Sequence, residues 1–96
     1  MIRHICMFKF KEDNKEENIK LALEKVQALK ELPEIKRFEV ATNMSEAPAS
    51  NYELSLIFDF ESMDDLNAYQ QNPKHLEFGN FIKSVREDRA CIDFKI

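Results

Sequence analysis

The sequence predicts an α+β fold in which helices cover one face of a four-stranded antiparallel sheet. Four segments alternate apolar and polar side chains as strands do, and two helical regions lie between them. The order along the chain is strand, helix, strand, strand, helix, strand, or βαββαβ. A chain of 96 residues suffices for one domain with a single two-layer core, so we expect one domain over residues 1–96.

The first strand is expected at Ile2–Phe10, with His4 and Cys6 on its more apolar face. Lys15–Leu32 then repeats apolar residues at helical spacing, which predicts an amphipathic helix. Pro33 ends that helix, because proline has no backbone N–H to donate.

Two strands follow, at Ile35–Thr42 and Tyr52–Phe60, joined by the polar loop Asn43–Asn51. The last strand is expected at Ala90–Ile96. Its alternation predicts that Ala90, Ile92, Phe94 and Ile96 face the helices and that Cys91, Asp93 and Lys95 face outward.

The second helical region is interrupted. Ser62, followed by Asp65, is typical of a helix start, and this helix is expected to stop near Gln71. Asn72 then caps a fresh helix, with a proline at its first position. His75 occupies the third position on the apolar side, so its ring is predicted to face inward.

This order, with right-handed crossovers, favours a ferredoxin-like arrangement. The outward face of its sheet is more apolar than a lone domain needs, since it carries Ile5, Met7, Ile57 and Cys91. We expect a second copy to cover this face and to form a homodimeric α/β barrel. The alternative is that these residues are scattered exposed hydrophobes without a partner.

Composition excludes several partners. The net charge is -4 and no block of five like charges occurs, which argues against nucleic acids and anionic membranes. An RNA-recognition module would also need aromatic residues on the open sheet face. The first residues lack the apolar run of a signal peptide, so the expected location is cytoplasmic. We expect no cofactor and no metal, and we interpret Cys6 and Cys91 as free buried thiols.

Three segments, MIRHICMFKFK, FESMDDLNAYQQNPKHLEF and VREDRACIDF, together resemble the stress-responsive α/β-barrel (Dabb) family over essentially the whole chain. The resemblance implies ferredoxin-like homodimers whose sheets face each other. A distant relative in that family is olivetolic acid cyclase, which closes the ring of a linear polyketide by aldol condensation. Its catalytic tyrosine and histidine fall in the segment that matches AYQQNPKH.

The resemblance therefore implies catalytic positions for Tyr69 and His75. The first-strand histidine of the cyclase matches His4. The match fails at Leu54, where the cyclase has a further pocket histidine, and at Asn72, which replaces the first histidine of the HPxH motif.

Chemistry supports these candidates independently. A histidine at a helix N-terminus and in an apolar pocket is disfavoured as imidazolium, so His75 suits a general base. Tyr69 would donate to a carbonyl oxygen, and His4 would assist. The only glycine, Gly79, indicates either close backbone approach or room for a ligand. The ligand expected in the pocket is small and apolar, aromatic or polyketide-like.

Three alternatives stay open. The histidines and the tyrosine are purely structural, or the dimer binds a ligand without catalysis, or it is a cofactor-free monooxygenase of the dimeric ferredoxin-like class. Arg86, Glu87, Asp88 and Arg89 are expected to form a salt-bridged corner before the last strand.

Overall fold

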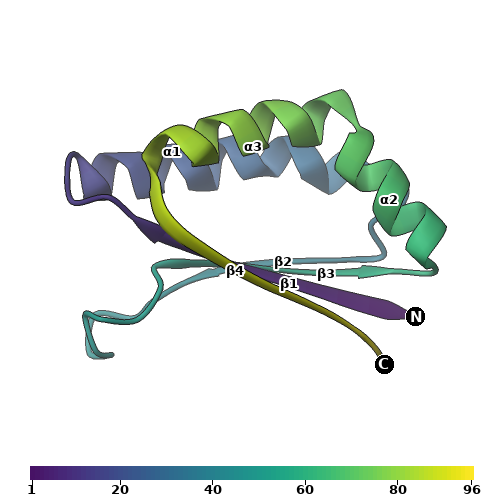
Figure 1. Ribbon diagram of the computed structural model, residues 1–96, viewed down its shortest axis with the longest axis horizontal. Helices are drawn as coiled ribbons and strands as arrows, with labels where there is room; N and C mark the ends of the chain where they lie inside the picture. The colour runs from purple at the N-terminus through teal and green to yellow at the C-terminus, as the bar shows by residue number, and fades with distance from the viewer.

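A computed structural model describes residues 1–96 and confirms the ferredoxin-like fold. The elements are β1 (Ile2–Phe10), α1 (Lys15–Val26), the 3₁₀ helix η1 (Gln27–Glu31), β2 (Arg37–Thr42), β3 (Leu54–Phe60), α2 (Met63–Gln71), α3 (Pro73–Val85) and β4 (Arg86–Lys95). The strands form one antiparallel sheet in the order β2-β3-β1-β4. All helices lie on one face of this sheet (Figure 1).

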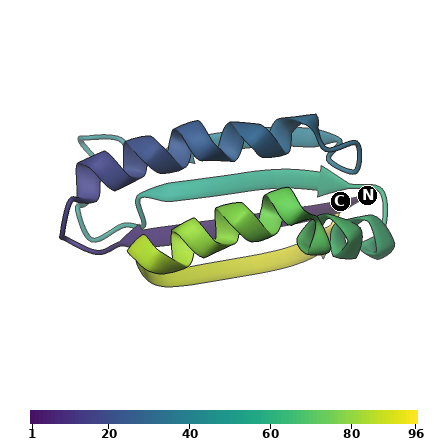
Figure 2. The same cartoon turned by 90° about the horizontal axis from the view of Figure 1, so that it is seen from above.

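The core fills the layer between sheet and helices. Viewed from above, α3 lies over β1 and β4, and α1 covers the other half of the sheet (Figure 2). The central strands contribute most of the aromatic side chains in this layer. Its fully buried residues include Phe10, Phe58 and Phe60 from the sheet and Val26, Leu29 and Leu66 from the helices. No helix combines the length and the apolar composition that a membrane span requires.

Local signals position the two helices that carry the candidate site. The Ser62 hydroxyl accepts a hydrogen bond of 3.2 Å from the Asp65 N–H, which starts α2 as predicted. The Asn72 side chain accepts one of 2.9 Å from the Lys74 N–H and starts α3. His75 is thereby fixed in the first turn of α3, immediately after the end of α2.

The structure corrects the prediction for the last strand. β4 begins at Arg86, four residues earlier than expected, because its first residues pair with the end of β1. Its faces are also reversed. Cys91 lies opposite Cys6 and Asp93 opposite His4, so both face the helices, whereas Ile92 lies opposite Ile5 on the open face.

The reversal makes the open face more apolar than predicted. Ile57, Ile5 and Ile92 pair across three neighbouring strands and form one row on this face. Met7, Ile92 and Phe94 are 38%, 59% and 39% exposed. An apolar surface of this kind on an open sheet is typical of a protein interface.

Candidate functional site

A pocket of about 240 Å³ lies between α3 and the half of the sheet beneath it, and it brings the three predicted site residues together. It is lined by His4, Cys6, Phe8, Leu56, Tyr69, Gln70, His75, Phe78, Gly79, Ile82, Lys83, Arg86 and Arg89. A larger, more open depression of about 540 Å³ beside the β2–β3 loop contains none of the three. We therefore place the candidate site in the smaller pocket.

His75 has a defined tautomer. Its Nδ1 lies 2.9 Å from the Gln70 carbonyl oxygen. Since a carbonyl oxygen only accepts, Nδ1 carries the proton, and the neutral ring keeps its lone pair on Nε2. Burial lowers the pKa of His75, the hydrogen bond to Gln70 opposes this shift, and the nearby His4 and Arg89 lower the pKa further.

Tyr69 lies beside His75 in the pocket. The two ring centroids are 4.6 Å apart, and Tyr69 is only 1% exposed. The Tyr69 hydroxyl forms no hydrogen bond with the protein. Every fully buried side-chain nitrogen or oxygen in the structure has a hydrogen-bond partner, so this hydroxyl oxygen is not fully buried. It is therefore reached from the pocket that Tyr69 lines. Burial raises the pKa of Tyr69, which keeps the hydroxyl protonated as a donor.

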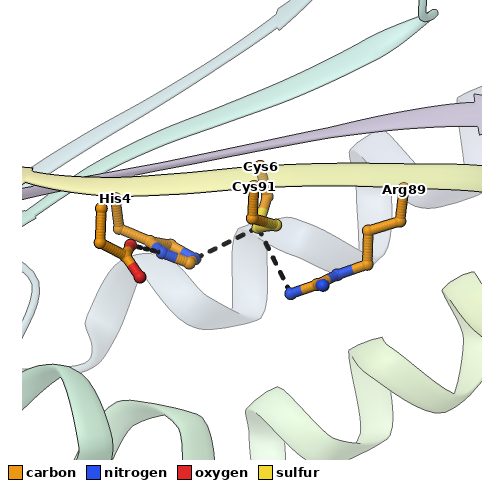
Figure 3. The surroundings of a disulfide bond; sticks show 5 residues. His4, Cys6, Arg89 and Cys91 are labelled. Carbon is orange, nitrogen blue, oxygen red and sulfur yellow. Dashed lines mark hydrogen bonds and ion pairs between the residues drawn. A yellow bond between two sulfur atoms is a disulfide. The ribbon is translucent and has the colours of Figure 1, made fainter.

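His4 faces the same pocket from β1 and is 4% exposed. Its Nδ1 is hydrogen bonded to the Asp93 carboxylate, and its ring centroid lies 6.3 Å from that of Tyr69. Figure 3 shows His4 on the helix-facing side of the sheet, and the strand register places Asp93 opposite it on β4. The sequence prediction missed Asp93 because it assigned this residue to the outward face.

The pocket floor contains a disulfide, which corrects the interpretation of free thiols. Cys6 and Cys91 are direct partners across β1 and β4, with Cα atoms 4.2 Å apart, and they are bonded. Their sequence separation of 85 residues concealed this proximity. His4 Nε2 lies 3.4 Å from Cys6 Sγ, and Arg89 Nη2 lies 3.7 Å from it on the other side (Figure 3).

Two further features shape the pocket. A Cβ added to Gly79 would meet no atom within 4 Å, so of the two predicted alternatives this position provides open space and not a close backbone approach. The predicted salt-bridged corner is wrong, because neither Arg86 nor Arg89 forms an ion pair. Both line the pocket instead. No three His, Cys, Asp or Glu side chains form a group that would hold a metal ion.

Comparisons with known proteins agree with the fold. The model of the Dabb family, described as "Stress responsive A/B Barrel Domain", matches residues 2–96. No curated protein matches the chain.

Similar solved structures include two dimeric ferredoxin-like proteins of unknown function. One, from Thermobifida fusca, has a TM-score of 0.89 and 25% identity over 99% of this chain and 90% of that chain. Another, from Bacteroides fragilis, has a TM-score of 0.83 and 29% identity over 99% and 95%. A hydroxynitrile lyase from Passiflora edulis has a TM-score of 0.84 over 99% and 92%, and its 21% identity shows a shared fold alone.

Proposed function

Because this chain belongs to the Dabb family of stress-responsive A/B barrel domains, we propose that its pocket binds a small carbonyl compound and that His75 removes a proton from the carbon beside the carbonyl group. One observation carries this proposal. The Gln70 carbonyl holds the proton on Nδ1 of His75, which leaves Nε2 as a free acceptor in a pocket that Tyr69 also lines.

In the proposed step, the C–H bond breaks and the proton moves to His75 Nε2. The electron pair of that bond moves toward the carbonyl oxygen, which becomes an enolate. The Tyr69 hydroxyl donates a hydrogen bond to this oxygen, where it stabilises the developing negative charge. Once the proton on Nε2 has been replaced by one from solvent, the reverse transfer to the same carbon completes an exchange. Attack of the enolate on a second carbonyl group would give an aldol-type product.

His4 has a supporting role in this proposal. The Asp93 carboxylate accepts a hydrogen bond from Nδ1–H and fixes the ring, as carboxylates do for many functional histidines. His4 then presents Nε2 toward the disulfide and the pocket. We therefore assign His4 to orienting the ligand, and the Asp93 side chain to orienting His4.

The functional form in this proposal is a homodimer that pairs through the open sheet face. The neighbours from two bacteria are described as dimeric. The row of isoleucines on this chain's open face supplies an apolar surface of the kind that dimer interfaces bury. Pairing of these faces would form the barrel that the family description names.

The test is the exchange of carbon-bound protons with solvent. Small ketones and oxo acids are incubated with the protein in D₂O, and NMR measures loss of the proton signal beside the carbonyl group. We expect exchange that depends on the protein for at least one compound and that His75→Gln abolishes. The matched control is Leu76→Gln, which changes the neighbouring residue of α3 at a position 53% exposed and outside the pocket.

The same experiment separates the alternatives. Binding of a compound without exchange would overturn catalysis in favour of a ligand-binding dimer. Consumption of oxygen together with loss of the compound would indicate a cofactor-free oxygenation, which also begins with a carbanion. Exchange that persists in His75→Gln would contradict the assignment of the base.

A further inference from the structure

We propose that the carbonyl compound bound in this pocket carries a carboxylate and that Arg86 and Arg89 bind it, with Lys83 beside them. This inference rests on the proposed function and deepens it by naming the class of substrate as a small oxo acid. The sequence prediction was for a small apolar or aromatic ligand. The charge of the residues lining the pocket points to an anionic one.

The pocket is cationic in an acidic chain. Its 13 lining residues include Lys83, Arg86 and Arg89 but no aspartate or glutamate. The whole chain contains 18 acidic and 14 basic residues, for a net charge of -4. A pocket with three cations and no anion is therefore not the result of a generally basic surface.

These cations form no ion pair within the protein, although Arg86 is near enough to Asp88 to help lower the pKa of that carboxyl group. None of the ion pairs in the structure involves Lys83, Arg86 or Arg89. The one hydrogen bond of the Arg89 side chain goes to the disulfide sulfur of Cys6, at 3.7 Å, and this sulfur is a weak acceptor. Figure 3 shows its guanidinium extending along the helix-facing side of the sheet toward that sulfur.

The strand register explains why nearby carboxylates do not neutralise them. Arg86 lies opposite Phe10 and Arg89 opposite Phe8, on the face where these phenylalanines enter the core. Asp88 lies opposite Lys9 and accepts a hydrogen bond of 2.5 Å from the Tyr52 hydroxyl. Alternation along β4 directs Arg89 toward the pocket and Asp88 away from it. The register shift between Lys9 and Phe10 interrupts this alternation and places Arg86 on the pocket side as well.

Chemistry and size both favour a small oxo acid. A guanidinium offers two parallel N–H donors that match the two oxygens of a carboxylate. The volume of about 240 Å³ equals that of roughly eight water molecules at about 30 Å³ each. With its carboxylate at the arginines, such a molecule would still have its carbonyl group available for Tyr69 and His75.

The test compares two probes that differ at one group. Acetoacetate and acetylacetone have equal numbers of non-hydrogen atoms and an acidic methylene, but only acetoacetate carries a carboxylate. Protein NMR titration gives Kd for each, and deuterium exchange at the methylene gives the rate. We expect acetoacetate to bind roughly tenfold or more tightly than acetylacetone, since a charge-assisted bond of about 1.5–3 kcal/mol is lost without the carboxylate.

Substitution then assigns the preference to the arginines. In Arg86→Gln/Arg89→Gln the two probes should bind about equally, because acetoacetate loses affinity and acetylacetone does not. Arg86→Lys/Arg89→Lys should retain part of the preference, which separates charge from the guanidinium geometry. Arg37→Gln, which removes an exposed arginine of β2 outside the pocket, should leave the preference unchanged.

The outcomes distinguish this inference from the proposed function. Equal affinities in the wild type, or an unchanged preference in both arginine variants, would overturn the carboxylate site. Exchange of both probes at similar rates would then leave the proposed function standing. If acetate alone bound as tightly as acetoacetate, the arginines would form a general anion site and the oxo-acid assignment would be wrong.

Discussion

Removal of the Cys6–Cys91 bond should cost a large part of the folding free energy. The bond closes a loop of 85 residues between the first strand and the last. In the chain-entropy model, a loop of this length loses about 15 cal/mol/K when it is closed, which corresponds to about 4.6 kcal/mol at 25 °C. Small domains are stable by roughly 5–15 kcal/mol, so the predicted loss is a third or more of the total.

The assay is urea unfolding of the wild type with and without a thiol reductant, at fixed protein concentration. Reduction keeps both sulfur atoms and therefore isolates the cross-link from packing. With m of about 1–3 kcal/mol/M, the midpoint should fall by roughly 1.5 M or more. Cys6→Ala/Cys91→Ala should fall at least as far, because it also removes the buried Cys6 sulfur.

Two results would refute this reasoning. Two titratable thiols in protein purified under oxidising conditions would show that the bond does not form. A urea midpoint that reduction leaves unchanged would show that the bond does not restrict the unfolded chain further, as expected if β1 and β4 stay close together there without it.

Three further predictions concern the open face and two titrating groups. In the proposed homodimer Ile92 lies in the interface, so Ile92→Asp should give a monomer in light scattering because it would bury a charge there, whereas Met63→Asp, on α2, should stay dimeric. A dimer in both variants would refute the proposed interface. The pKa of His75 in the folded protein is lowered from 6.5. The contribution of neutral His75 to stability is therefore fully present above pH 6.5 and is lost as the pH falls through the pKa of His75 in the folded protein. Stability should therefore decline as the pH falls below 6.5, whereas exchange activity should decline as the pH falls through the lowered pKa of folded His75. A stability profile that His75→Gln leaves unchanged would contradict the shift. The two Arg3–Asp59 hydrogen bonds of 2.8 and 3.0 Å lower the pKa of Asp59 from 3.8, so Asp59→Asn should reduce stability at neutral pH and flatten its loss below pH 3.8; equal acid profiles would argue against this pair.

Much of the site could be predicted from the sequence because helix starts and the more apolar faces of the elements that carry it can be identified there. Capping residues fixed the start of α3, and therefore the inward position of His75. His4 lies on a strand whose other face is clearly more polar, and Tyr69 lies on the apolar side of a short helix. Their placement in one pocket agrees with the prediction, while their chemical roles remain proposals.

β4 could not be predicted from alternation, because alternation gives a period of two but not the direction of the faces. Its more apolar set, which includes Ile92 and Phe94, lies on the open face rather than in the core. The usual assumption that the apolar set faces inward fails for a strand whose outer face is itself apolar. Asp93 was missed for this reason, and the disulfide was missed for the same reason together with the wide sequence separation of its cysteines, since both follow from the register of β4 on β1.

The central claim is that His75 presents an unprotonated Nε2 to the pocket at neutral pH. Nitrogen NMR of the ¹⁵N-labelled histidine ring tests it directly, because protonated and unprotonated ring nitrogens have well-separated chemical shifts. At pH 7 we predict a neutral ring with the proton on Nδ1, held by the Gln70 carbonyl. A proton on Nε2, or a ring protonated on both nitrogens, would contradict the account.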